Sequence, residues 1–229
     1  MPSRRRCDAG NWADDEFTPI SPAVLADAIA ERAAGHHGRV CVAISAADAA
    51  APLDLAEQVA ARLRVEGRPA AVLSLHDFVR PASLRFEHGR TDQESYRANW
   101  FDFGALDREV VRGLRENGRW LPKLWDEVED RSARARRIDA PDGQVLTIAG
   151  PMLLGRGLAF DVTVHLAMSQ AALDRLTPAE DRWTIPPLLG HDAATAADAD
   201  IVVRYDHPDR PAMHAAGALG GDRRAGRGR

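Results

Sequence analysis

The residues at 40–56 follow the order of a nucleotide-binding unit but lack the residue types that hold phosphate. An apolar segment at 40–44 is followed by small residues and then by an amphipathic helix pattern. A phosphate-binding loop at this place has the pattern G-x-x-x-x-G-K-[ST]. The corresponding residues here are Ala46, Ala51, Pro52 and Leu53. The sequence therefore predicts the shape of such a unit without its usual chemistry.

Each replacement removes a defined interaction. Ala46 and Ala51 carry a Cβ where glycine permits positive φ and close approach of the phosphate. Pro52 removes both the lysine cation and one backbone N–H, and Leu53 removes the hydroxyl that binds magnesium. Because one preorganised group is worth about 3–4 kcal/mol in a transition state, ordinary ATP-dependent catalysis by this loop is not expected. The alternative interpretation is a structural strand-to-helix turn, with Pro52 at the helix start where proline is favoured.

Composition and charge favour one globular unit and argue against several partners. The chain has 229 residues, and we expect a single domain at 20–212 between flexible tails at 1–19 and 213–229. Net charge is −4, and the arginines of the two tails leave about −10 on the stretch between them, a poor surface for nucleic acid. The best apolar stretch, at 145–168, is interrupted by Arg156 and Asp161, so no membrane span is expected. No signal peptide is apparent and two distant cysteines form no metal motif, so we expect a cytoplasmic protein without a metal site; oligomeric state is left open.

Periodicity predicts an α/β fold. Short apolar runs predict five strands, and helical spacing separates them. The strands are expected at 40–44, 69–75, 145–149, 162–166 and 201–203, and the helices near 22–35, 55–63, 93–99, 105–116, 170–176 and 187–197. Strands alternating with helices predict a mostly parallel five-stranded sheet covered on both faces. The loops after residues 44, 75, 149 and 166 should then meet at one cleft, beyond the carboxyl ends of the strands.

Several motifs in consistent order make the chain resemble the uridine kinase family of P-loop proteins, in particular actinobacterial uridine kinase-like proteins. The likeness runs from about Arg39 to Pro211. It rests on the strand-loop-helix at 40–63, Asp77-Phe-Val-Arg-Pro81, Tyr96-Arg…Phe101-Asp102, Leu124-Trp125-Asp126, Gly150-Pro-Met-Leu-Leu and Ala199-Asp200-Ile-Val-Val. The resemblance implies a P-loop nucleoside kinase fold. It also implies an acidic residue at the end of the third strand, where this chain has Ala149.

The resemblance also indicates an acceptor pocket. The residue that activates the nucleoside hydroxyl would be His76 or Asp77, depending on a one-residue choice of alignment. Asp102 matches the position that hydrogen-bonds the sugar, and the neighbouring cleft positions are Arg80, Arg97, Trp125 and Asp126. The alternative interpretation pairs Arg80 with Asp77 and Arg97 with Asp102 as solvated ion pairs. A lid at 173–183 would offer only Arg175 and Arg182 as cations, and Arg156 is a further candidate for an anion contact.

Three functions are compatible with these residues. The first is a kinase-like protein that keeps a nucleoside-type cleft but is impaired in phosphoryl transfer. The second is an active phosphotransferase in which arginines at 80, 156, 175 and 182 compensate for the lysine; only this function requires ATP and magnesium. The third is a structural or interaction protein without a ligand, with Trp100, Trp120 and Trp125 as candidates for an exposed partner surface.

Overall fold

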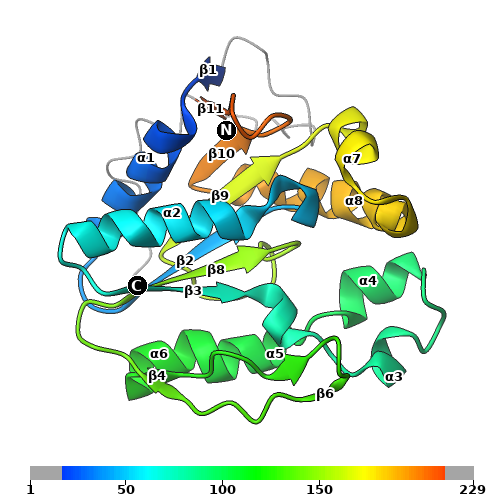
Figure 1. Ribbon diagram of the computed structural model, residues 1–229, viewed down its shortest axis with the longest axis horizontal. Coiled ribbons are helices and arrows are strands. Elements are labelled where there is room, and N and C mark those ends of the chain that lie inside the picture. The colour runs from blue at the N-terminus through cyan, green and yellow to red at the C-terminus, as the bar shows by residue number, and fades with distance from the viewer. Residues whose placement is uncertain (1–16, 215–229) are drawn as a thin grey trace, which may run out of the picture.

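A seven-stranded sheet forms the centre of the protein in the computed structural model, which describes residues 17–214 (Figure 1). Its strand order is β1-β11-β10-β9-β2-β8-β3. The five strands from β10 to β3 are parallel, whereas β11 is antiparallel to both β10 and β1. The strands are β1 Phe17–Pro19, β2 Val40–Ser45, β3 Ala70–Ser74, β8 Val145–Gly150, β9 Val162–Ala167, β10 Ile201–Arg204 and β11 Ala212–His214.

The five predicted strands are confirmed, and the prediction of only five is corrected by the pair β1 and β11. Each of these strands has three residues, too few to show a periodicity of two in the sequence. They extend the edge of the sheet at β10, and Ile20 N–H donates to Pro211 O beside them. The predicted flexible tails therefore include strand residues at 17–19 and 213–214, while 1–16 and 215–229 lie outside the described residues.

Helices α1 (Pro22–Ala34) and α2 (Pro52–Val65) pack side by side against the sheet, as their spacing predicts (Figure 1). Ser21 caps α1 by accepting a hydrogen bond from Val24 N–H at 3.2 Å, and Pro22 occupies the first turn. Leu55, Val59 and Leu63 form the buried stripe of α2. Both helices are thus positioned by the packing of an apolar face.

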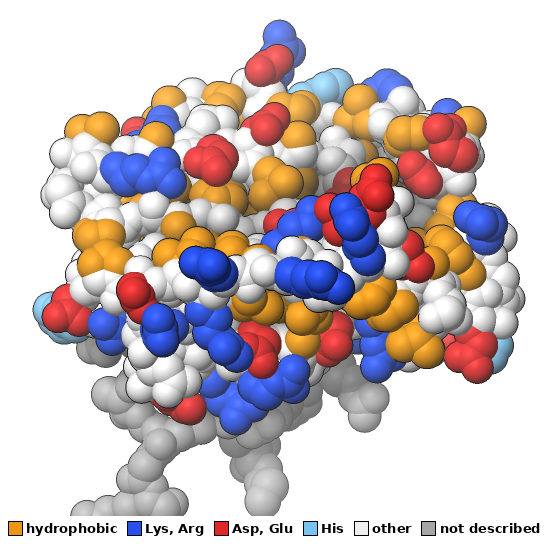
Figure 2. All heavy atoms as spheres, turned by 60° about the horizontal axis from the view of Figure 1, so that its bottom comes forward, with side chains coloured by type: hydrophobic (Ala, Val, Ile, Leu, Met, Phe, Trp, Pro, Cys, Tyr) orange, Lys and Arg blue, Asp and Glu red, His pale blue; other side chains and the backbone are white. Residues whose placement is uncertain are grey.

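The polar segment 76–142 forms a small subdomain on the other side of the sheet from α1 and α2 (Figure 1). It contains α3 Ala82–Arg85, α4 Gln93–Asn99, α5 Phe103–Leu106, a π-helical turn Asp107–Val111, α6 Arg112–Asn117, and the short strands β4 Arg119–Trp120, β5 Trp125–Asp126, β6 Arg131–Ser132 and β7 Ile138–Asp139. The predicted helix at 105–116 is thus interrupted by a π turn, and the Glu109 carbonyl of that turn accepts from Leu121 N–H. Figure 2 shows basic and acidic side chains mixed on the face that it presents. Ion pairs of the subdomain include Arg112–Asp107 and Arg119–Asp139.

The chain after β9 supplies the helices beside the cleft. These are α7 Gln170–Leu176, a 3₁₀ turn Ala179–Thr184 and α8 Ile185–Thr195, so the helix expected at 187–197 begins two residues earlier. At the carboxyl edge of the sheet, Gly150 lies against Leu75, whose Cβ would be 2.5 Å from any Cβ at position 150. That close approach brings together the loops that follow β3 and β8. Within residues 17–214, every helix is too short or too polar to span a bilayer.

Candidate functional site

The loop between β2 and α2 keeps the bent path of a phosphate-binding loop but uses its amides internally. Residues 48–50 form a 3₁₀ turn in which Ala50 N–H donates to Ala47 O and Ala51 N–H donates to Asp48 O, both at 2.9 Å. Two backbone donors of the bend are thereby occupied. Pro52, the first residue of α2, has no N–H to offer.

Ala51 adopts the left-handed conformation, with φ 46° and ψ 55°. A residue with a Cβ is strained there by about 1–2 kcal/mol, and glycine would avoid most of that cost. The bend is therefore maintained by the surrounding structure, although glycine would suit this position better than alanine.

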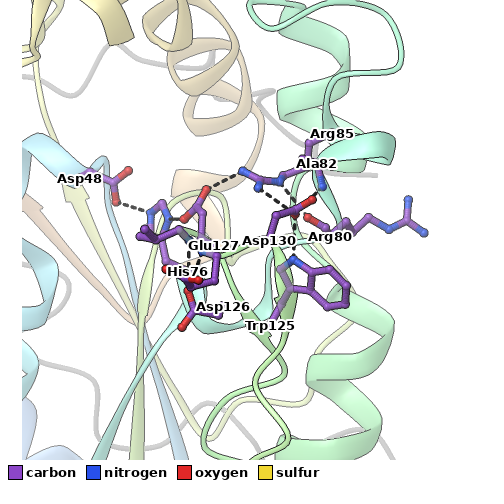
Figure 3. Close-up of polar contacts among 11 residues, drawn as sticks. Asp48, His76, Arg80, Ala82, Arg85, Trp125, Asp126, Glu127 and Asp130 are labelled. Carbon is purple, nitrogen blue, oxygen red and sulfur yellow. Dashed lines mark hydrogen bonds and ion pairs between the residues drawn. The ribbon is translucent and has the colours of Figure 1, made fainter.

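A chain of charged side chains crosses the mouth of this loop (Figure 3). The ring of His76 lies between two carboxylates, with Nε2 3.0 Å from Asp48 Oδ1 and Nδ1 3.0 Å from Glu127 Oε2. Glu127 Oε1 in turn accepts from Arg85 Nη1 at 2.7 Å. The chain connects the phosphate-loop position, the turn after β3 and the segment after β5; we call it the His76 network.

Arg85 anchors the far end of the His76 network. Its side chain is 4% exposed, donates to the Arg80 carbonyl at 2.8 Å, and lies over the rings of Phe86 and Trp100. Asp130 Oδ1 is 3.7 Å from Arg85 Nη2 and also accepts from Ala82 N–H and from the Trp125 indole N–H. The network is therefore held from both sides and is part of the folded structure.

The His76 network fixes the charge state of the histidine. Burial alone would lower the pKa of His76, but the hydrogen bonds to Asp48 and Glu127, with their negative charges, raise it to about 10. The ring is thus protonated at neutral pH and both ring nitrogens are engaged. This argues against the expectation that His76 acts as a general base near neutrality, because a base must hold a free lone pair.

We expect the stability of the protein to fall as pH rises from about 6.5 to about 10, with a contribution from His76. Its pKa is higher in the folded than in the unfolded state, so the contribution is complete below about 6.5 and disappears through about 10. The slope stays below about 1.4 kcal/mol per pH unit, the limit for one proton, because the ring is 36% exposed and solvent screens the pairs. Urea unfolding of His76→Gln should lack this slope, whereas exposed His207→Gln should retain it. An identical slope in His76→Gln would contradict the assignment.

Asp77 is the base candidate that retains a free carboxylate edge. Burial raises its pKa, and Lys123, whose Nζ lies 3.5 Å from Asp77 Oδ1, opposes that rise. Lys123 also lies 3.4 Å from Asp126 Oδ2, and Asp126 accepts backbone N–H bonds from Val128 and Glu129. The single lysine of the chain therefore lies on the acceptor side rather than in the loop.

The other predicted acceptor residues lie around the turn after β3, and each has a local partner. Asp102 Oδ1 caps α5 by accepting from Ala105 N–H at 2.8 Å, while Oδ2 has no hydrogen bond within the part of the chain that the structure describes. Arg97 forms a bidentate pair with Glu94 rather than with Asp102, and Arg80 contacts Asn99 Oδ1 at 3.4 Å. The solvated ion pairs of the alternative interpretation, Arg80 with Asp77 and Arg97 with Asp102, are therefore not the contacts that form.

The candidate anion contacts do not gather at one point. Arg175 donates to the Asp206 carbonyl beside β10, and Arg182 donates to the Thr177 carbonyl. Arg156 lies apart from both, in the loop after β8, where it donates to the carbonyls of Met152 and Arg97. The predicted exposed tryptophans are corrected: Trp100 and Trp120 are buried and Trp125 is half-buried.

Sequence reasoning missed the partners in the His76 network and a second buried pair. Asp48 could have been noticed from the sequence, because an acidic residue inside a phosphate-loop pattern is unusual. No local sequence pattern marks Glu127 or Arg85 as a site residue. The second pair is His165 on β9 and Asp192 on α8, with His165 Nε2 3.9 Å from Asp192 Oδ2. Burial lowers the pKa of His165 to about 4 and raises that of Asp192 to about 7. Among residues 17–214, neither ring nitrogen of His165 has a side-chain hydrogen-bond partner, although the side chain is 1% exposed.

Comparison with solved structures places this geometry in a known architecture. A uridine kinase candidate from Bacillus stearothermophilus aligns over 78% of this chain and 98% of its own, with a TM-score of 0.59 and 21% identity. A candidate fructose transport system kinase from Silicibacter aligns over 78% and 93%, with a TM-score of 0.53 and 24% identity. The fold is that of the P-loop kinases. No family model and no curated protein matches the sequence, so the likeness establishes the α/β P-loop fold alone.

Proposed function

We propose that this P-loop fold serves a nucleoside kinase-like protein that binds a nucleoside-type ligand and does not transfer phosphate from ATP. The observation that carries the proposal is the Asp48–His76 contact at the mouth of the loop. A carboxylate stands in the bend where a kinase of this fold holds a polyphosphate. Ala46, Ala51, Pro52, Leu53 and Ala149 occupy the positions of the degenerate Walker A and Walker B motifs.

Charge supports the proposal. A phosphate oxygen within about 4 Å of the Asp48 carboxylate would be repelled, by about 1 kcal/mol in water and by about 4 kcal/mol at an effective dielectric of about 20. The Asp48 side chain is 54% exposed, so the repulsion is nearer the lower figure. No lysine offsets this repulsion, because Lys123 pairs with Asp77 and Asp126 instead. The protonated His76 does not help a phosphate either, since both ring nitrogens already contact carboxylates.

The contacts of the other arginines weigh against an active enzyme that compensates for its missing lysine. Arg80 contacts Asn99, Arg175 the Asp206 carbonyl and Arg182 the Thr177 carbonyl. These partners lie in three different segments, all outside the bend at 46–53. A compensating cation would have to leave its present partner to reach a triphosphate.

The acceptor side supports retention of a ligand. Asp102 uses one carboxylate oxygen to cap α5 and keeps the other available for a sugar hydroxyl. Asp77 lies on the neighbouring turn, with a pKa raised by burial, which suits a residue that takes up a hydroxyl proton. Both positions belong to the motifs that resemble the uridine kinase family.

Calorimetric titration with uridine, cytidine and Mg-ATP tests the proposal, followed by a phosphotransfer assay with the same mixtures. We expect a nucleoside to bind, Mg-ATP to give no heat at millimolar concentration, and turnover to stay far below the roughly 1 s⁻¹ of an ordinary enzyme. Asp102→Asn should weaken nucleoside binding about tenfold or more, since a hydrogen bond to a charged group is lost. Its melting temperature should hold, because asparagine caps helices as well as aspartate does. Turnover near 1 s⁻¹ or above would refute the proposal.

One observation favours a purely structural or interaction role as the second candidate. Trp183, in the turn before α8, contacts the rings of Tyr96 and Trp100 on α4, with centroids 5.4 and 5.5 Å apart. These ring contacts hold the segment at the lid position against the acceptor subdomain. If the same titration finds no nucleoside binding, this candidate replaces the first.

A further inference from the structure

Arg156 is held in a fixed orientation by three separate parts of the fold. Its Nε donates to Met152 O at 3.1 Å within its own loop, and its Nη2 donates to Arg97 O at the end of α4, at 2.7 Å. The guanidinium carbon lies 4.5 Å from the centre of the Phe103 ring on α5. The loop leaves the carboxyl end of β8, the edge at which ligands bind in parallel α/β sheets.

The charge of Arg156 is not neutralised. The side chain is half-buried, yet no carboxylate lies within ion-pair distance of it anywhere in residues 17–214. Burial first and then the nearby Arg97 lower its pKa. Arg68 shows what a purely structural arginine does here: its Nε, Nη1 and Nη2 all donate to backbone carbonyls. By contrast, Nη1 of Arg156 has no hydrogen bond to a described residue.

The loop that carries Arg156 is strained at the residues that orient it. Met152 is 1% exposed and has φ 54°, a conformation that is unfavourable for a residue with a Cβ. The carbonyl of Met152 is the acceptor for Arg156 Nε. Gly155 has φ 69°, and a Cβ there would lie 2.7 Å from Thr195 Cγ2 on α8. Strain of this kind persists where the surroundings impose it, and it gathers at functional sites.

A second unsatisfied group lies near Arg156. His191 on α8 has a buried Nε2 without a hydrogen-bond partner. Burial, Arg156 and Arg97 lower its pKa to about 4, opposed by a hydrogen bond to the Leu154 backbone, so the imidazole is neutral at pH 7. Because Nε2 has no partner among the described residues, the bond to Leu154 is made by Nδ1, and Nε2 of the neutral ring is an acceptor suited to a ligand hydroxyl rather than a donor to an oxyanion.

We propose that Arg156 binds an oxyanion, a carboxylate or phosphate carried by the small molecule in the cleft. Nη1 and the remaining N–H of Nη2 lie in one plane, an arrangement that donates hydrogen bonds to two oxygens of such a group. The inference rests on the proposed function in so far as that function supplies the ligand-binding cleft. It adds the charge of the ligand, and it assigns the contact to the loop after β8 rather than to the loop at 46–53.

The test compares paired probes on the full chain by calorimetry. Uridine and uridine 5′-monophosphate differ only in the phosphate, and inorganic phosphate and malonate separate phosphate from carboxylate recognition. We expect the monophosphate or an anionic probe to bind at least tenfold more tightly than its neutral counterpart, and Arg156→Gln to abolish that gain while uridine affinity is kept. Arg156→Lys should recover only part of it, because the ammonium lacks the planar fork. Arg136→Gln, at an exposed arginine, controls for net charge and should leave the gain intact.

The outcomes separate this inference from the proposed function. Equal affinity of the wild type for uridine and its monophosphate, with no binding of phosphate or malonate, overturns the inference and leaves the proposed function in place. Binding of phosphate or malonate that Arg156→Gln removes, without nucleoside binding, supports the inference and removes the proposed function. The comparison of uridine with its monophosphate needs only the wild type. It therefore tests the inference even if a variant folds poorly.

Discussion

Arg85→Ala is expected to lower the free energy of unfolding by about 3–5 kcal/mol, the cost of breaking a buried ion pair by removing one partner. The guanidinium is 4% exposed and bonds Glu127 at 2.7 Å and the Arg80 carbonyl at 2.8 Å. Its removal leaves Glu127 with only His76 as a partner and opens space against Phe86 and Trp100. Urea unfolding at pH 7 measures the loss.

Two further variants separate charge from packing in this experiment. Arg90 also lies over the Phe86 ring, at 4.9 Å, but it is exposed, so Arg90→Ala should cost well under 1 kcal/mol. Arg85→Met keeps most of the apolar stem and should remain nearly as destabilised as Arg85→Ala if the lost charge dominates. A loss below about 1 kcal/mol for Arg85→Ala would show that the His76 network is not a structural element.

The parallel core was predictable because its signals are local. Each of the five parallel strands is a short run of apolar residues, and all six residues of β2 and of β8 are buried. Helices such as Gln93–Asn99 and Gln170–Leu176 were found at their observed bounds. The strands β1 and β11 could not be found in this way, since their pairing joins residues almost two hundred positions apart and their three-residue length carries no pattern.

The candidate site was only partly predictable, for a related reason. Ala46, Ala51, Pro52 and Leu53 could be judged because a phosphate loop has a fixed local spacing, whereas the partners of His76 come from positions 28 residues before it and 51 residues after it. Glu127 and Arg85 lie among many charged residues in a polar segment, and nothing in their spacing selects them. Buried polar pairs between distant segments depend on how the fold brings those segments together. The local pattern of a single sequence does not contain that information.

The sheet and the loop after β2 depend on different residues. The sheet is stabilised by buried apolar side chains such as Ile44, Leu146 and Val164. The bend after β2 tolerates the left-handed conformation of Ala51 at a cost of about 1–2 kcal/mol, small beside the burial of such a core. The charged groups that cross the loop then add contacts of their own to the folded state.

Asp192→Asn is expected to stabilise the protein by about 2–4 kcal/mol at pH 8. Burial raises the pKa of Asp192 from 3.8 to about 7, and a rise of that size corresponds to about 4 kcal/mol. The carboxylate is 20% exposed and its nearest polar partner is the neutral His165 at 3.9 Å, so ionisation is not compensated. Asparagine removes the charge with little change of shape.

The sign of the pH dependence identifies the residue responsible. Between about pH 3.8 and 7 the folded state binds the Asp192 proton more tightly than the unfolded state does, so the free energy of unfolding falls as pH rises and the loss is complete above 7. The advantage of Asp192→Asn should therefore shrink to less than half by pH 5, whereas Asp198→Asn, at an exposed acid just after α8, should be neutral at both pH values. Urea unfolding at pH 5 and 8 decides the matter, and an advantage independent of pH would show that the buried charge is not its cause.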